Sequence, residues 1–205
     1  MNIKERKVHY KNRISEICSQ ELEKGQVVLL GDCVIENLKC DDYFPDSIIY
    51  NNGISGDTTS QLTETLYKRA IKFKPSKLFI SIGSNDIGFE GKSVKETYEA
   101  IVGIVKEVQS RSKETEIHIV SVIPVNPAIK DFINREYVDA RDNYEISMLN
   151  YYLRNYARKN RINYVDARKE LSTSFDQLNL EYTFDGFHLN KSGYDVFSRL
   201  IKQYL

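Results

Sequence analysis

The sequence predicts an α/β fold in which a parallel β-sheet carries helices on both faces. Short apolar runs typical of buried strands alternate along the chain with amphipathic segments of helical period. Several of these runs end abruptly in small polar loops, which is common at the carboxyl ends of parallel strands. The length of 205 residues is enough for one domain with a substantial core.

The alternation can be followed from one end of the chain to the other. Strands are expected at 26–30, 47–50, 78–82, 117–123 and 162–165. Helices are expected at 1–24, 58–73, 94–108, 136–160 and 194–204, with a short helical turn at 34–38. Capping boxes are expected at Thr58–Gln61 and Ser93–Glu96. The sequence therefore predicts a single domain, 1–205, with a three-layer α/β/α sandwich of flavodoxin-like type and a five-stranded parallel sheet.

Composition excludes several classes of function. Lysine plus arginine and aspartate plus glutamate both number 29, so the chain lacks the excess positive charge typical of a nucleic-acid-binding protein. Three cysteines and three histidines form no metal-ligand spacing, and an odd cysteine count argues against a disulfide framework. No glycine-rich phosphate-binding motif occurs, so we expect neither metal nor cofactor. With no membrane-length apolar run and a charged start, the sequence predicts a cytoplasmic protein without a membrane span.

The polar loops carry the residue types that acyl transfer requires. Cys33 follows the first expected strand, Gly56 lies in the loop after the second, and Asn85 follows the third. His188 lies near the end of the chain, three residues after Asp185. Each residue alone has a simpler explanation, because free cysteines are usually buried and asparagines often form turns. Together they provide a nucleophile, an imidazole, a carboxylate and hydrogen-bond donors for an oxyanion.

Four sequence blocks resemble those of SGNH hydrolases, in the GDSL esterase/lipase superfamily. The blocks are Leu30-Gly31-Asp32-Cys33, the stretch 51–58, Ile82-Gly83-Ser84-Asn85-Asp86, and the stretch 185–190. They occur in the family's order, and the resemblance extends over nearly the whole chain. Within the superfamily, the chain is most similar to proteins like platelet-activating-factor acetylhydrolase.

The resemblance implies a nucleophile–His–Asp triad with an oxyanion hole and no cofactor. Cys33 takes the nucleophile position, with His188 as the base and Asp185 as the acid that orients it. The backbone N–H groups of Cys33 and Gly56 and the side-chain amide of Asn85 are the expected oxyanion donors. The expected partner is a small-molecule ester, and a homodimer is included among the expected states.

The family's nucleophile is serine, whereas this chain has Cys33. Three explanations stay open: a natural thiol nucleophile, an engineered replacement of serine, and a loss of hydrolysis. An adjacent imidazole and the N-terminus of the following helix would both favour the thiolate form of this thiol. Asp32 and Asp57 have simpler explanations, as residues that hydrogen-bond the backbone, cap a helix or support their loops.

The sequence predicts a carboxylic ester hydrolase, and its substrate stays open. Acetyl groups on sugars, short-chain esters and lysophospholipid-like esters all fit the residues. The alternative function is an acyl-ligand-binding protein on the same fold with impaired catalysis. The acid, the base and both expected oxyanion-hole loops are retained, namely Asp185, His188, Gly56 and Asn85, and this favours the enzyme.

Overall fold

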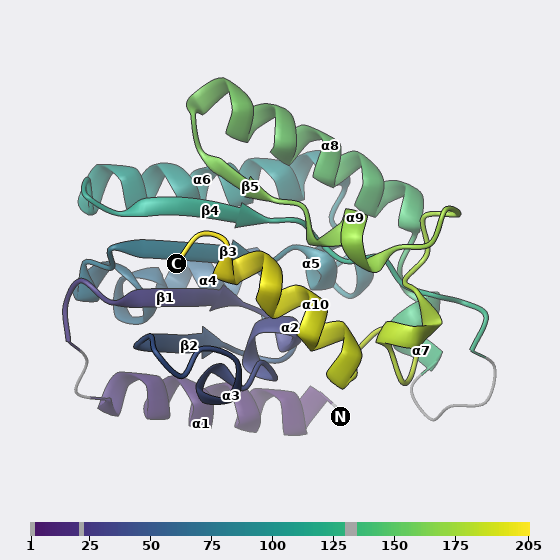
Figure 1. Cartoon of the computed structure of the whole chain (residues 1–205), viewed down its shortest axis with the longest axis horizontal. Coiled ribbons are helices and arrows are strands. Elements are labelled where there is room, and N and C mark those ends of the chain that lie inside the picture. Colours follow the sequence, from purple (N-terminus) through teal and green to yellow (C-terminus); the bar gives the residue numbers. More distant parts are fainter. Residues whose placement is uncertain (1–2, 21–22, 130–134) are drawn as a thin grey trace. The chain divides into compact units, whose positions relative to one another are not determined.

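The computed structural model describes residues 3–20, 23–129 and 135–205 (Figure 1). Its strands are β1 Val27–Gly31, β2 Ile49–Gly53, β3 Lys77–Ser81, β4 Glu116–Val120 and β5 Asn163–Val165. Its α-helices are α1 Ile3–Ser19, α2 Cys33–Glu36, α3 Cys40–Tyr43, α4 Thr59–Arg69, α5 Ser84–Gly88, α6 Val94–Arg111, α7 Arg135–Asp139, α8 Asn143–Asn160, α9 Ala167–Leu171 and α10 Lys191–Lys202. Two short 3₁₀ helices are η1 Ile71–Phe73 and η2 Leu180–Tyr182.

The five strands form one parallel sheet with helices on both faces, in the order β2-β1-β3-β4-β5. This order is the one found in flavodoxin-like folds, in which each crossover connection carries a helix. β1 lies between β2 and β3 and pairs with both, so that Gly31 at its end is in register with Gly53 and Ser81. The α/β fold class predicted from the sequence is thus confirmed.

Contacts between Cα atoms divide the chain into two compact units. The first unit comprises residues 1–82 and 100–118, and the second comprises 83–99 and 119–205. The first unit contains β1, β2 and β3, with α1 to α4. The second unit contains β5, α5 and the helices from α7 to α10. Within the part of the chain that the structure describes, no helix is long and apolar enough to cross a membrane.

Several expected elements have other bounds in the structure, and three of them are explained here. The helix expected at 1–24 is α1, and residues 1–2 and 21–22 of that expectation lie outside the described residues. The second strand was expected at 47–50, yet β2 runs from Ile49 to Gly53 because its backbone pairs with β1 through that glycine. Residues 83–86, expected as a loop, instead contain the N-cap and the first residues of the helical turn α5. The helix expected at 136–160 is two helices, because the Asp142 side chain caps a new N-terminus by accepting from Tyr144 N–H. In the first two cases tertiary pairing or packing overrides local turn preference.

The two expected capping boxes have different outcomes. Ser93 and Glu96 form the reciprocal pair, because Glu96 N–H donates to Ser93 Oγ while Ser93 N–H donates to Glu96 Oε2. Thr58 occupies the N-cap position of α4, but its side chain makes no capping hydrogen bond. The Thr58–Gln61 box is therefore wrong as a capping motif, although the expected helix starts there.

His118 on β4 is the basis for a prediction about acid stability. Its ring is fully buried and stacks on Phe79 of β3, with ring centroids 4.3 Å apart. Burial lowers the pKa of His118 from 6.5 to about 4, because a charged imidazole would lose its hydration there. Between these two pH values the unfolded chain binds a proton that the folded chain does not, so folding becomes less favourable as the pH falls.

We expect the free energy of unfolding to decrease by about 2 kcal/mol as the pH falls from about 6.5 to about 4. Urea unfolding of the parent and of His118→Phe at several pH values in this window measures the effect. The variant should lose most of this pH dependence, since phenylalanine keeps the stack on Phe79 and cannot be protonated. An equal slope in both proteins would contradict the assignment.

Candidate active site

Cys33 lies two residues after the end of β1, in the loop where the sequence predicted it. It is the first residue of α2 and is 5% exposed. Asp32 caps this helix, since its Oδ1 accepts a hydrogen bond of 3.1 Å from Val34 N–H. Because α2 has only four residues, it contributes the N–H groups of its first turn rather than a full helix macrodipole. Asp32 therefore has the local backbone role that the sequence predicted.

The close approach of β1 and β3 at this point depends on Gly31. A Cβ at Gly31 would lie 2.2 Å from the carbonyl oxygen of Ser81, which no larger residue could tolerate. The Asp32 N–H also donates to this oxygen, at 3.3 Å. The glycine thus fixes where the backbone turns before Cys33.

Gly56 lies in the loop that follows β2, and its φ of +79° explains why glycine is needed. The neighbouring Ser55 N–H donates to the carboxylate of Glu36, the last residue of α2. Glu36 also contacts the His9 ring on α1 at 3.0 Å. The short helix that begins with Cys33 therefore ends with the residue that holds the Gly56 loop.

A buried ion pair anchors the other end of this loop. Asp57 Oδ2 accepts a hydrogen bond of 2.6 Å from Arg69 Nη1, and both side chains are fully buried. Asp57 Oδ1 accepts from Thr58 N–H, while Arg69 Nη2 donates to the Asn52 carbonyl at 2.7 Å. Burial raises the pKa of Asp57, and the Arg69 guanidinium opposes this rise. Asp57 supports the loop, which is one of the two roles expected for it.

The second unit contains the predicted acid and base as a preformed pair. Asp185 Oδ2 lies 2.6 Å from His188 Nδ1, and Asp185 Oδ1 accepts from the backbone N–H groups of Phe187 and His188. Burial by itself would raise the pKa of Asp185, but the hydrogen bonds from the ring and backbone of His188 outweigh it and lower that pKa. An ionised Asp185 makes Nδ1 the donor, so Nε2 of the neutral ring is left as an acceptor.

The loop around this pair is held by its own side chains. Thr183 Oγ1 donates to the His188 carbonyl and accepts from Gly186 N–H, at 2.7 and 2.9 Å. Gly186 has a φ of +83°, and a Cβ there would lie 2.4 Å from the Asn126 carbonyl oxygen. These contacts set the backbone conformation in which residues 185 and 188 meet.

Aromatic rings surround His188 within the second unit. Phe184 stacks on it nearly in parallel, with centroids 5.8 Å apart, and Phe187 contacts it edge-on at 4.6 Å. Tyr137 of α7 also meets it edge-on, at 5.8 Å. The rings restrict the orientation of the imidazole in addition to its bond with Asp185.

Asn85 lies in α5 and is 1% exposed. Its Oδ1 accepts a hydrogen bond of 2.7 Å from Nη2 of Arg141, whose Nε donates to Ser84 Oγ at the same distance. Sequence reasoning did not identify Arg141. It lies between two helices 56 residues from Asn85, and no local motif distinguishes it from other arginines.

The predicted site residues occur in both units. Cys33 and Gly56 belong to the first unit, whereas Asn85, Asp185 and His188 belong to the second. Within the second unit, the structure brings the acid and the base into contact.

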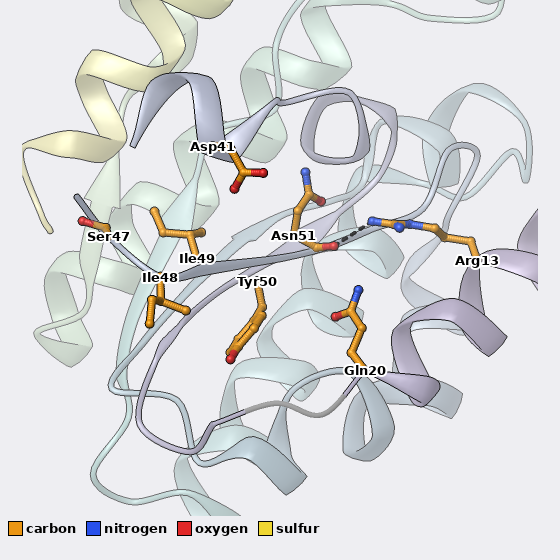
Figure 2. A pocket seen from close by; sticks show the side chains of 8 residues that line it. All are labelled: Arg13, Gln20, Asp41, Ser47, Ile48, Ile49, Tyr50 and Asn51. Atoms are coloured by element: carbon orange, nitrogen blue, oxygen red, sulfur yellow. Dashed lines mark hydrogen bonds between the residues drawn. The ribbon is translucent and has the colours of Figure 1, made fainter. Parts of the chain in front are cut away.

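A separate cavity of about 540 Å³ opens beside β2 in the first unit (Figure 2). Two of the polar side chains in its lining make hydrogen bonds to the surrounding backbone. Arg13 donates to the Asn51 carbonyl at 2.7 Å, and the Tyr50 hydroxyl accepts from Glu23 N–H. Its lining residues are Arg13, Gln20, Asp41, Ser47, Ile48, Ile49, Tyr50 and Asn51. This cavity is therefore distinct from the predicted active-site residues.

Comparisons with known proteins give the family of the chain. The model of the GDSL-like lipase/acylhydrolase family matches residues 24–196. The structure is similar to that of a Streptococcus pneumoniae protein assigned as a platelet activating factor, with a TM-score of 0.86 and 27% identity, covering 96% of this chain and 92% of that one. It is also similar to a GDSL-like lipase of Bacteroides thetaiotaomicron, with a TM-score of 0.81 and 26% identity, covering 95% and 96%.

One curated relative is longer than this chain. The N-acylneuraminate cytidylyltransferase of Escherichia coli is 26% identical over 201 residues, which cover 94% of this chain but 43% of that protein. The chain thus spans less than half the length of this relative. The family match over most of the chain confirms the resemblance of the four sequence blocks: this chain belongs to the GDSL-like lipase/acylhydrolase family.

Proposed function

We propose that this chain hydrolyses small acyl or acetyl esters with Cys33 as nucleophile, His188 as base and Asp185 as the residue that orients the base. The observation that carries the proposal is the 2.6 Å contact between Asp185 and His188 Nδ1. It leaves Nε2 as the ring atom that can accept a proton. The position of Cys33 after β1, in the block where the family has its nucleophile, supports the remaining assignment.

The proposed reaction has two steps. In the first, His188 Nε2 takes the proton of Cys33, and the thiolate attacks the ester carbonyl carbon. The oxyanion that forms accepts hydrogen bonds from the N–H groups of Cys33 and Gly56 and from Nδ2 of Asn85. Its collapse breaks the bond to the alcohol, which leaves with the proton from His188. Water then gives a proton to His188 and attacks the thioester, releasing the acid and restoring the thiol.

The substrates to be tested follow from the esters that the sequence leaves open and from the names of two relatives. The Escherichia coli relative is named for an N-acylneuraminate, which is an acylated sugar. The Streptococcus pneumoniae relative is named for platelet activating factor. Acetylated sugars, short-chain esters and lysophospholipid-like esters therefore form the substrate panel. A homodimer stays a prediction, and a cytoplasmic location rests on the sequence argument and on the three free cysteines.

Cys33→Ser tests whether the site suits an oxygen nucleophile. Sulfur is larger than oxygen and its bonds are longer, so an oxyanion hole shaped for serine would be misaligned with a cysteine adduct. Small misplacements of reacting atoms cost on the order of 10²-fold in rate. We therefore expect Cys33→Ser to raise the rate on p-nitrophenyl acetate and butyrate by about 10²-fold if the site evolved for serine.

Cys33→Ala provides the matched control, since it is similar in size and has no nucleophile. A decrease in Cys33→Ser, with Cys33→Ala inactive, would identify a natural thiol nucleophile. If the parent and Cys33→Ser are both folded but inactive on the whole panel, the hydrolase proposal is wrong. The second candidate function, binding of an acyl ligand without hydrolysis, would then be favoured, because Cys33 in place of the family's serine would mark the loss of catalysis.

A further inference from the structure

The guanidinium of Arg141 makes a two-point contact with the start of α5 in the second unit. Nη2 donates to Asn85 Oδ1 and Nε donates to Ser84 Oγ, both at 2.7 Å. Arg141 is 7% exposed, and the two acceptors are 1% and 6% exposed. Hydrogen bonds from a charged donor in such a buried site are among the stronger ones in proteins.

This contact determines which end of the Asn85 amide can donate. The two ends of an asparagine amide are similar in shape but opposite in hydrogen bonding, because the oxygen only accepts and the NH₂ only donates. A guanidinium has no acceptor, so a flipped amide would place two donors against each other. Arg141 therefore fixes Oδ1 toward itself and leaves Nδ2 of Asn85 on the other side of the amide.

Arg141 itself is held by its neighbours. Its guanidinium carbon lies 4.7 Å from the ring centre of Phe89 and 4.1 Å from that of Phe187, and its Nη1 donates to the Tyr137 carbonyl. A Cβ at Gly88 would lie 3.0 Å from the side chain of Arg141, so this glycine leaves the space that the arginine fills. Cation–π contacts with desolvated rings add to the rigidity of the guanidinium.

We propose that Arg141 is a positioning residue that holds the Asn85 amide in the orientation needed to donate to the oxyanion. The inference rests on the proposed oxyanion role of Asn85. Arg141 acts through Asn85, so its effect is expected on kcat rather than on KM.

A double-mutant cycle isolates this route. The cycle compares the unmodified protein, Arg141→Met, Asn85→Ala and the double variant. It is measured twice, once with Cys33 present and once in the Cys33→Ser background. Asn85→Ala is expected to lower kcat by about 10²–10³-fold, the usual effect of losing one oxyanion donor. Arg141→Met is expected to lower kcat by roughly 10–10²-fold, and to have no further effect when Asn85 is already alanine. Arg141→Lys should recover part of the loss, since it can donate to Oδ1 but cannot form the fork.

The cycle also separates the two hypotheses. If Asn85→Ala leaves kcat unchanged, the proposed oxyanion role of Asn85 is wrong. If Asn85→Ala lowers kcat and Arg141→Met lowers it by the same factor in both backgrounds, Arg141 acts by another route, such as Phe187 beside His188. That result would overturn the inference without affecting the proposed function.

A spectroscopic measurement tests the same point without turnover. The side-chain ¹⁵N–¹H₂ resonances of Asn85 are identified by their loss in Asn85→Ala. In Arg141→Met they should shift and show larger-amplitude motion, because the amide is no longer held at Oδ1. Unchanged resonances would contradict the proposal even if no ester in the panel is hydrolysed. If Arg141→Met does not fold, Gly88→Ala is the second variant, since its new Cβ presses on Arg141.

Discussion

Replacing His188 with alanine is expected to lower ester hydrolysis by on the order of 10⁴-fold in the more active of the parent and Cys33→Ser. Without the imidazole, nothing in the proposed mechanism takes the proton of the nucleophile or returns it to the leaving alcohol. Asp185→Asn should cost a similar factor. An amide at this position can donate to Nδ1, which would favour the tautomer that carries the proton on Nε2 instead.

The initial rate of p-nitrophenyl acetate hydrolysis measures both variants, and Asp195→Asn is the matched control. Asp195 is a carboxylate of α10 that pairs with Lys191 at the surface, so its loss should leave the rate unchanged. Iodoacetamide labelling with mass analysis gives an independent reading. Cys33 should lose its selective alkylation in His188→Ala, whereas burial, which raises the pKa of Cys40 to about 12, keeps that thiol unreactive in both proteins. If His188→Ala keeps the rate of the unmodified protein and its three cysteines are labelled equally in both proteins, His188 is not the base.

Replacing Arg69 with methionine is expected to lower the free energy of unfolding by about 3–5 kcal/mol. Arg69 and Asp57 are fully buried, and removal of the guanidinium leaves a carboxylate without its counter-charge. The Asn52 carbonyl also loses its hydrogen bonds from Nε and Nη2 of Arg69. Guanidinium chloride unfolding, followed by circular dichroism, measures the difference.

The double variant Arg69→Met with Asp57→Leu separates the cost of an unpaired buried charge from the cost of the lost hydrogen bonds of Arg69. It should be more stable than Arg69→Met alone, because no unpaired charge remains buried. The pH provides a second check. Beside Arg69, burial raises the pKa of Asp57 to about 7, and without the guanidinium this pKa should be higher still, so the folded variant gains from protonation at a higher pH and the deficit should shrink as the pH falls toward 7. A deficit below about 1 kcal/mol, or one that grows on acidification, would contradict the role given to the pair.

Local sequence signals predicted the order of strands and helices and the positions of the candidate site residues. The apolar run before Cys33 predicted β1 because alternation of strands and helices requires a buried parallel strand there. Ser93 and Glu96 predicted the start of α6, since a capping box depends on residues three apart. Asp185 and His188 are equally close in sequence, and the structure confirms that they interact.

Other features depend on residues that are far apart in the chain. Asn51 to Gly53 form a strand rather than a turn because β1 supplies backbone partners for them. Arg69 meets Asp57, and Arg141 meets Asn85, across 12 and 56 residues. Nothing in the neighbouring sequence of either arginine marks it as buried.

The sequence by itself determined the fold class, the family and the positions of the residues proposed as nucleophile, acid, base and oxyanion donors. These follow from hydrophobic period and from short blocks, both of which are local. The tertiary structure alone decided which buried charges neutralise or orient the polar groups of those loops. The physical reason is that burying a polar group is costly unless a partner is supplied, and the partner can come from any part of the chain that folding brings near. Arg69 beneath the Gly56 loop and Arg141 beside Asn85 are such partners.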